Sequence, residues 1–523
     1  MEGYATTAPM RSALRLLPQA VLLGAIAFSL HLQRAVGDEV FWSGDAGLKA
    51  LMTHQFAGGE LHADLRLPAE TWVQTLWGEG LYPFEPPFVY AIAGRHYIQY
   101  PLAFPLVSAV PYRVFGWRGL YLLPLLSTWL LWGAFLVVCR RWGWDAPEAA
   151  AALAALALAS PLTFYSATYW EHAPAVALVF LGLLPLLTPD RPTGRAGLVA
   201  HGVAFGLALW LREELFALLA GLVALALLAR ATGRAAWFPL RQAGPWFAGA
   251  LFPVAGFLAA NEILYGQPLG AHAFAVFRFQ GRARLENALS MFGILMRRLV
   301  WSFPIALLAL SLPFLPRTEV PPTRDAPLRF LVAFSALAVA GISFLLPDVQ
   351  LDGSGGKQWG PRFLLVVIPP LCLLAGQVVR EARLRSAPAI RVASGAAFLL
   401  LFAASLHVNL VQGSRVLSQD YASRVLPSVA FLRRDSASSV AVAHQFIAQE
   451  TMPALPTKRF FLTRNPGQIA LLADALDAHG EREFVYVSYP GPVPEPVTTR
   501  SGHVVHFAPI GAFDAYSIAR ASW

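Results

Sequence analysis

About eleven apolar stretches, each near the length that a helix needs to cross roughly 30 Å of hydrocarbon, constrain the fold of this chain more than any other feature. Lipid cannot satisfy exposed backbone polar groups, so segments of this kind must be helices. The sequence therefore predicts a mainly α-helical, multi-pass membrane protein. We place the spans at Leu16–Leu32, Gly119–Val138, Pro147–Phe164, His172–Leu187, Gly197–Leu211, Leu215–Ala229, Trp246–Leu264, Leu299–Leu315, Leu328–Leu346, Phe363–Val379 and Ala393–Val411.

The composition supports a membrane protein and argues against a nucleic-acid-binding one. Hydrophobic residues make up 56% of the 523 residues and charged residues only 14%, which lies outside the usual range of soluble domains. The net charge of +9 comes mostly from Arg and Lys at the ends of the apolar stretches. We therefore assign these charges to membrane topology and to contacts with anionic lipid headgroups, and we expect no nucleic acid partner.

The positions of the basic residues predict the orientation in a cell membrane. The stretch Pro101–Phe115 is short and contains three prolines, so we expect a helix that lies at the outer surface. With that choice the basic clusters all fall on one side, which the positive-inside rule identifies as the cytoplasm. The amino terminus is then cytoplasmic and the first span is an uncleaved anchor. Cys139 and Cys372 fall at cytoplasmic helix ends, so neither a disulfide nor a cysteine-ligated metal site is expected.

The same topology divides the chain into two predicted domains. Residues 1–411 form the membrane domain, which includes a large outer first loop at residues 34–117 with surface helices. Residues 412–523 form a small extracytoplasmic α/β domain, in which strand-like runs flank an amphipathic helix. These runs are Ser439–Ala443, Arg459–Leu462 and Phe484–Ser488, and the helix lies near Gln468–Ala478.

The first outer loop opens with the acidic motif Trp42-Ser43-Gly44-Asp45-Ala46-Gly47-Leu48-Lys49. Its glycines allow close approach of another backbone, and Lys49 could pair with an anionic group. Asp45 is either the N-cap of a following amphipathic helix or a catalytic carboxylate. Further along the loop, Phe88–Tyr90 and His96–Ile98 flank Gly94-Arg95, which predicts a β-hairpin that leads to Gln99 and Tyr100.

Charged residues also occur at the outer ends of later spans. Glu171 and His172 follow a short outer turn, and they either mark the membrane interface or take part in function. Arg212 is followed by Glu213 and Glu214 with almost no loop between two apolar stretches. Three such charges are costly unless they pair with one another or line a wet cavity, so Arg212 is either self-neutralised or binds a phosphate.

Arginines in the outer loop Gly266–Arg298 run against the positive-inside bias. Arg278 and Arg282 lie there among aromatic and aliphatic residues, and Arg362 begins a later span after Gly360-Pro361. A basic amphipathic element of this kind attracts anionic lipid headgroups. The sharper hypothesis is that one or two of these arginines bind a phosphate, because the guanidinium fork matches phosphate geometry.

In order along the chain, these features resemble the GT-C superfamily of integral-membrane glycosyltransferases, in particular the branch that contains protein O-mannosyltransferases and the lipid A aminoarabinose transferase. The resemblance is clearest over Met1–Ala229 and extends more diffusely to Val411. It rests on the early outer acid Asp45, Gln99–Leu106, Phe115-Gly116, Cys139-Arg140-Arg141, Ser160-Pro161, Glu171 and Gly360–Leu364.

The resemblance implies transfer of a sugar from a polyprenyl-phosphate donor to an envelope acceptor, which is a lipid, glycan or protein hydroxyl, on the outer face with inversion. It also implies that Asp45 acts as base or orienter, and Glu171 and His172 are the other candidate catalytic residues. Our candidates for binding the donor or its phosphate are Lys49, Gln99, Tyr100, Arg212, Arg278, Arg282 and Arg362.

Many relatives carry two adjacent acids where this chain has Asp45-Ala46. A divalent metal is therefore an alternative, but we expect no metal and no cofactor. The competing function is a transporter or flippase of a lipid-linked intermediate. It would explain the spans and the basic outer surface, but it gives Asp45 and Glu171 no role. A third reading is an inactive relative whose tail binds a partner.

Overall fold

The computed structural model describes residues 14–67, 69–191, 193–233, 238–271, 280–311, 322–346, 358–384 and 387–523. These residues are mainly helical, with one six-stranded sheet and one hairpin. They fall into two compact units. The membrane unit consists of Met1–Arg34 and Tyr121–Ser414, and the loop–tail unit consists of Ala35–Leu120 and Arg415–Trp523.

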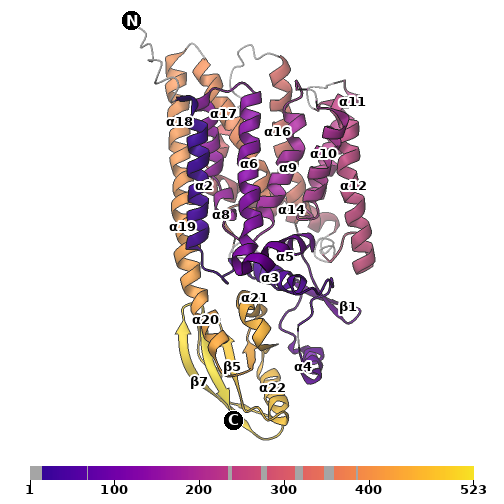
Figure 1. Ribbon diagram of the computed structural model, residues 1–523, viewed down its shortest axis with the longest axis vertical. Coiled ribbons are helices and arrows are strands. Elements are labelled where there is room, and N and C mark those ends of the chain that lie inside the picture. The colour runs from indigo at the N-terminus through magenta and orange to yellow at the C-terminus, as the bar shows by residue number, and fades with distance from the viewer. Residues whose placement is uncertain are drawn as a thin grey trace. The chain divides into compact units, whose positions relative to one another are not determined.

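The membrane unit is a bundle whose long helices run in a common direction (Figure 1). Its helical segments are α2 (Leu17–Ala35), α6 (Leu122–Arg141), α7 (Ala146–Ala157), α8 (Leu162–Tyr165), α9 (His172–Leu187), α10 (Arg195–Ala208), α11 (Leu215–Ala231), α12 (Leu240–Tyr265), α14 (Gly281–Ser302), α15 (Ala306–Leu310), α16 (Pro322–Leu345), η5 (Arg362–Val367), α17 (Ile368–Leu384), α18 (Pro388–Leu406), η6 (His407–Gln412) and α19 (Gly413–Arg415). Among the described residues, five helices are long and apolar enough to cross a membrane, and four further apolar helices have 10–17 residues. The chain is therefore an integral membrane protein, and the number of eleven spans stays a prediction.

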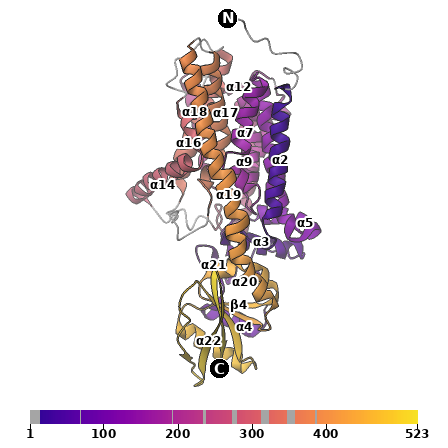
Figure 2. The same ribbon diagram turned by 90° about the vertical axis from the view of Figure 1, so that its left-hand side faces the viewer.

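Most predicted spans coincide with observed helices, and the span His172–Leu187 has the bounds of α9. The continuous span Leu299–Leu315 is wrong. Residues 299–302 end the long helix α14, which projects sideways from the bundle (Figure 2), and a separate short helix, α15, begins at Ala306. The break falls at Phe303-Pro304, because proline lacks an amide hydrogen and disfavours helical geometry in the residue before it.

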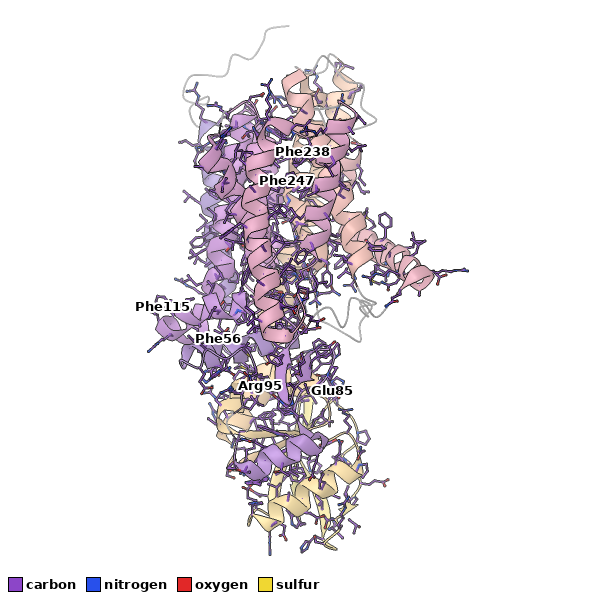
Figure 3. The ribbon with its side chains drawn as sticks, turned by 90° about the vertical axis from the view of Figure 1, so that its right-hand side faces the viewer. Phe56, Glu85, Arg95, Phe115, Phe238 and Phe247 are labelled. Atoms are coloured by element: carbon purple, nitrogen blue, oxygen red, sulfur yellow. The ribbon has the colours of Figure 1, made fainter. Side chains whose placement is uncertain are left out.

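The loop–tail unit combines the first outer loop with the carboxyl-terminal residues. Its helical segments are α3 (Gly44–Ala57), α4 (Thr71–Leu76), η1 (Trp77–Leu81), α5 (Ala103–Phe115), η2 (Gly116–Tyr121), η7 (Val416–Tyr421), α20 (Ala422–Arg434), α21 (Gln445–Glu450), η8 (Met452–Thr457) and α22 (Pro466–Ala478). Helices α3 and α5 lie side by side, with Phe56 near the end of one and Phe115 at the end of the other (Figure 3). The Thr53 hydroxyl donates to the carbonyl oxygen of Pro105 at 3.3 Å between them.

The predicted hairpin is confirmed, since β1 (Val89–Ile92) pairs antiparallel with β2 (Arg95–Ile98). The tail carries the three predicted strands and the predicted helix, but its sheet is larger than expected. The strand order is β4-β3-β5-β8-β7-β6. These strands are β3 (Ser439–Val442), β4 (Arg459–Leu462), β5 (Glu483–Ser488), β6 (Val497–Thr498), β7 (Val504–Phe513) and β8 (Tyr516–Ser522). Only β3, β4 and β5 pair in parallel.

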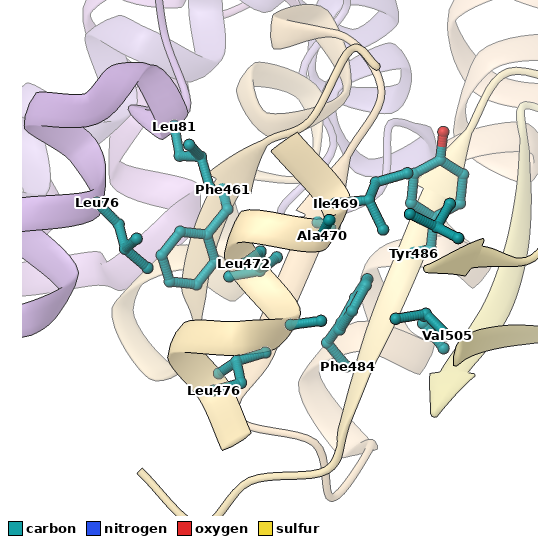
Figure 4. Close-up of a cluster of buried hydrophobic side chains, with 14 of the residues drawn as sticks. Leu76, Leu81, Phe461, Ile469, Ala470, Leu472, Leu476, Phe484, Tyr486 and Val505 are labelled. Atoms are coloured by element: carbon teal, nitrogen blue, oxygen red, sulfur yellow. The ribbon is translucent and has the colours of Figure 1, made fainter. Parts of the chain in front are cut away.

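The first loop and the tail share one hydrophobic core. Leu76 and Leu81 from the loop lie in the same buried cluster as Phe461, Leu472 and Leu476 from the tail (Figure 4). Whereas the sequence groups residues 34–117 with the membrane helices, the structure groups Ala35–Leu120 with the tail. A segment that buries its side chains in another segment's core folds with it, so these two parts form one domain.

Candidate functional site

Helix α3 positions the candidate catalytic acid. Ser43, in extended geometry, occupies the N-cap position, and the helix begins at Gly44. Asp45 therefore lies inside the first turn, and the alternative reading of Asp45 as the N-cap is wrong. Its side chain is buried. Because the amino end of a helix carries a partial positive charge, this position stabilises a carboxylate.

Lys49 lies one turn after Asp45, on the same side of α3. The structure brings it against Tyr100, with Nζ 4.2 Å from the centroid of the tyrosine ring. Both side chains are buried. The hairpin fixes the backbone just before Tyr100, because the backbone amide of Gln99 donates to the carbonyl oxygen of Phe88 at 2.9 Å. Asp45, Lys49, Gln99 and Tyr100, four of the predicted residues, thus belong to one packed region of the loop–tail unit.

The two glycines of the motif lie directly against helix α21 of the tail. A Cβ atom on Gly47 would be 1.9 Å from the backbone carbonyl oxygen of Gln449, and one on Gly44 would be 2.0 Å from the side-chain Oε1 of the same residue. Real Cβ atoms do not approach other atoms so closely. Glycine is therefore required at position 47, whereas at position 44 a larger residue would have to displace the side chain of Gln449.

In the membrane unit, Glu171 and Arg212 form a buried ion pair. Nη1 of Arg212 lies 2.8 Å from Oε1 of Glu171, and Nη2 lies 2.6 Å from Oε1 of Glu214. The Glu171 side chain is 2% exposed. Burial lowers the pKa of Arg212, but the carboxylates of Glu214 and Glu171 raise it more, so its net pKa lies above the ordinary value. The arginine stays charged and already has two anionic partners.

Arg362 lies near the ion pair of Arg212 and Glu171, and it contacts aromatic rings there. Its Cζ lies 5.2 Å from the centroid of the Trp170 ring and 4.8 Å from that of the Phe363 ring. Cζ of Arg212 lies 5.1 Å from the Phe363 ring as well. Two guanidinium groups therefore share one ring, which is a favourable cation–π arrangement for both. The predicted residues Glu171, Arg212 and Arg362 are brought together.

Tyr165 and His172 complete this cluster. The His172 ring lies 5.3 Å from the Tyr165 ring and 5.2 Å from the Trp170 ring, measured between centroids. Burial raises the pKa of Tyr165, while the charges of Arg362, Arg212 and Arg298 partly lower it. Arg298 belongs to the arginines of the loop Gly266–Arg298 for which the sequence suggested phosphate binding, but we did not select it as a candidate. Like Arg362, it directly precedes a predicted outer span end, which is the signal that could have singled it out.

Close packing around Gly360 explains the glycine of the Gly360-Pro361-Arg362 motif. Gly360 has φ +60°, and a Cβ atom there would meet Oγ of Ser302 at 2.8 Å and Cγ of Pro161 at 3.2 Å. An L-residue rarely adopts this backbone geometry. The tight packing holds the start of η5, and with it the backbone of Arg362, against the ends of α14 and α8.

One phosphate-binding candidate, Arg282, does not join these clusters in the described contacts. Arg282 is 90% exposed near the start of α14 and pairs with Glu286 one turn away at 2.8 Å. Arg278 lies outside the described residues. Within the described part of the chain, no group of three or more His, Cys, Asp or Glu side chains is placed to hold a metal ion.

The fold is shared with solved membrane glycosyltransferases. The apo structure of the lipid A aminoarabinose transferase ArnT from Cupriavidus metallidurans matches with a TM-score of 0.56 and 14% identity over 96% of this chain and 98% of that one. ArnT bound to undecaprenyl phosphate matches with the same TM-score and identity over 95% and 97%. An Archaeoglobus fulgidus oligosaccharyltransferase in complex with Zn and sulfate matches with 0.49 and 12% identity over 89% and 67%.

No family model and no curated protein sequence matches this chain. The likeness is therefore one of structure, and it confirms the predicted fold, which this chain shares with ArnT.

Proposed function

We propose that this GT-C-fold chain is a cell-membrane glycosyltransferase that moves a sugar from a polyprenyl-phosphate donor to a hydroxyl of an envelope acceptor on the extracytoplasmic face. The observation that carries the proposal is Asp45, a buried carboxylate in the first turn of a helix, one turn before the buried Lys49. A lipid-linked donor is supported by the shared fold with ArnT, which has been solved with undecaprenyl phosphate. A shared fold alone does not establish activity, so the roles below are assigned residue by residue.

The proposed reaction is a single displacement. The carboxylate of Asp45 accepts the proton of the acceptor hydroxyl as its oxygen bonds to the anomeric carbon. The bond between that carbon and the phosphate oxygen breaks at the same time, so the anomeric centre inverts and polyprenyl phosphate leaves. For the membrane unit taken by itself, we propose that Arg362, held over aromatic rings, binds the phosphate of the lipid-linked donor. Arg298 is a second candidate for this role.

The test is sugar transfer by the purified chain in nanodiscs, supplied with radiolabelled polyprenyl-phosphate sugars and envelope fractions. Asp45→Asn should lower transfer by roughly 10²–10⁴-fold, the usual contribution of a general base, and leave donor binding unchanged. Asp38→Asn is the control, because Asp38 belongs to the same loop but is half exposed and pairs with Arg118. Transfer by Asp45→Asn at the wild-type rate would refute the role of Asp45. Movement of the intact donor across the bilayer without transfer would favour a flippase.

A further inference from the structure

The carboxyl-terminal sheet is joined to α3 by one short helix. Helix α21 follows β3 directly, and its residue Gln449 is fully buried against Gly44 and Gly47. These two glycines stand on either side of Asp45 in sequence. Packing against α21 therefore determines the position of the amino-terminal half of α3.

Further contacts hold α21 and the first loop in register. The backbone amide of Glu85 in the loop donates to Oε1 of Gln445 at 3.1 Å, and the indole of Trp77 donates to the carbonyl oxygen of Phe460 at 3.0 Å. The loop's Glu85 also pairs with Arg464 of the tail. Together with the shared core, these contacts leave the loop and the tail no independent movement without breaking packed surface.

We propose that the tail is a positioning domain for Asp45, with Gln449 as the residue that sets the height and rotation of α3. This rests on the proposed function for Asp45 and extends it by giving the tail a part in the reaction. A catalytic group displaced by about 1 Å can lose on the order of 10²-fold in rate. Perturbing the contact between α21 and α3 should therefore lower kcat without touching the donor's phosphate contacts.

The two glycines allow a rescue experiment, because different atoms of Gln449 face them. At Gly44 the nearest atom is the side-chain Oε1, whereas at Gly47 it is the backbone carbonyl oxygen. Gly44→Ala should lower kcat, and adding Gln449→Ala should restore most of the loss relative to Gln449→Ala alone. Gly47→Ala should lower kcat further, and Gln449→Ala should not restore it. Gly78→Ala is the control, because no atom lies within 4 Å of a Cβ at that glycine of the same unit.

Two readouts separate this inference from the proposed function. The first is hydrogen exchange of the α3 and α21 amides in the full-length protein. Gly47→Ala should speed exchange in both helices together, while Gly78→Ala should leave it unchanged. The second is kcat measured beside the dissociation constant for polyprenyl phosphate, of which only kcat should fall. Unchanged exchange and kcat in Gly47→Ala, or equal rescue of both glycine variants, would overturn the inference. Faster exchange in a protein whose wild type transfers no sugar would instead refute the proposed function alone.

Discussion

Arg212 and Arg362 approach the same ring, Phe363. Arg212 is paired with two carboxylates, at 2.8 Å and 2.6 Å. A guanidinium with two anionic partners gains less from a phosphate, since the added charge must compete with both. Arg362 lies against the rings of Trp170 and Phe363. Because Glu171 and Glu214 already match the charge of Arg212, Arg212 is the weaker candidate for the donor phosphate.

Replacing Arg362 by lysine should weaken donor binding, because a point charge cannot reproduce a planar fork with two parallel hydrogen bonds. We expect roughly a 10-fold or greater rise in the dissociation constant for polyprenyl phosphate, measured in nanodiscs of neutral lipid, since charged hydrogen bonds contribute about 1.5–3 kcal/mol. Arg282→Lys should bind as the wild type does, because Arg282 is exposed and paired with Glu286, and any attraction to lipid headgroups there depends on charge alone. Equal affinities of Arg362→Lys and Arg282→Lys for polyprenyl phosphate would show that Arg362 does not bind the phosphate.

Glu171 and Glu214 provide a matched pair for testing the second carboxylate. Each pairs with Arg212, so Glu171→Gln and Glu214→Gln remove the same kind of contact and should destabilise the protein to a similar degree. If Glu171 takes part in the reaction, only Glu171→Gln should lower sugar transfer, by at least roughly 10²-fold. The measurement is the transfer rate of both variants, with thermal unfolding as the check on folding. A similar fall in both rates would make the cluster structural.

Among the elements, the π-helical segment η6 is tied through one side chain to the loop after α7, the end of α14 and the residues before η5. The amide nitrogen of the buried Asn409 lies within hydrogen-bond distance of the carbonyl oxygens of Ala159, Ser302 and Ser405, at 2.9, 2.6 and 2.9 Å, which share its two hydrogens. Its Oδ1 accepts from the indole nitrogen of Trp359 at 3.0 Å. Trp359 lies three residues before Arg362, so this network fixes the segment that carries the candidate phosphate ligand.

Substituting Asn409 by leucine should destabilise the membrane unit by roughly 3 kcal/mol or more, because each buried polar group left without a partner costs about 1–3 kcal/mol. The expected result is a clear fall in the unfolding temperature in detergent. Ser343→Ala is the control, since this buried hydroxyl donates only within its own helix, to Val339. Equal unfolding temperatures for Asn409→Leu and the wild type would show that water or relaxation replaces the network.

For the molecule as a whole, the shared core of the loop–tail unit restricts the topology. His62 in the loop and Gly480 in the tail are both exposed, and they belong to one compact unit. Two parts of one folded core must lie on the same side of a membrane. The positive-inside rule further predicts that this side is extracytoplasmic.

Single cysteines at positions 62 and 480 should both react with a membrane-impermeant thiol reagent in intact cells. The native Cys139 and Cys372 are buried, so background labelling should be low. Labelling of both sites supports the predicted orientation, and protection of both would invert it. Labelling of only one site would contradict the single loop–tail unit itself.

Local features of the chain predict its elements well. Apolar runs, the turn residues of the hairpin and the alternation of the tail strands act over a few residues, so α9, the hairpin and β3 to β5 could be placed in advance. The antiparallel strands β7 and β8 were missed, and one span was drawn across Phe303-Pro304. For that span, the prediction followed the hydropathy of the segment and did not take account of the helix break that Pro304 indicates.

Contacts between distant residues were decided only by the tertiary structure. Glu85 and Arg464 pair across hundreds of positions, and the union of the first loop with the tail depends on such contacts. The chain has 40 basic and 31 acidic residues, so the partner of Arg212 could not be chosen before the fold brought Glu171 to it. Hydropathy and backbone geometry depend on neighbouring residues, whereas ion pairs and shared cores depend on which segments the whole fold places side by side.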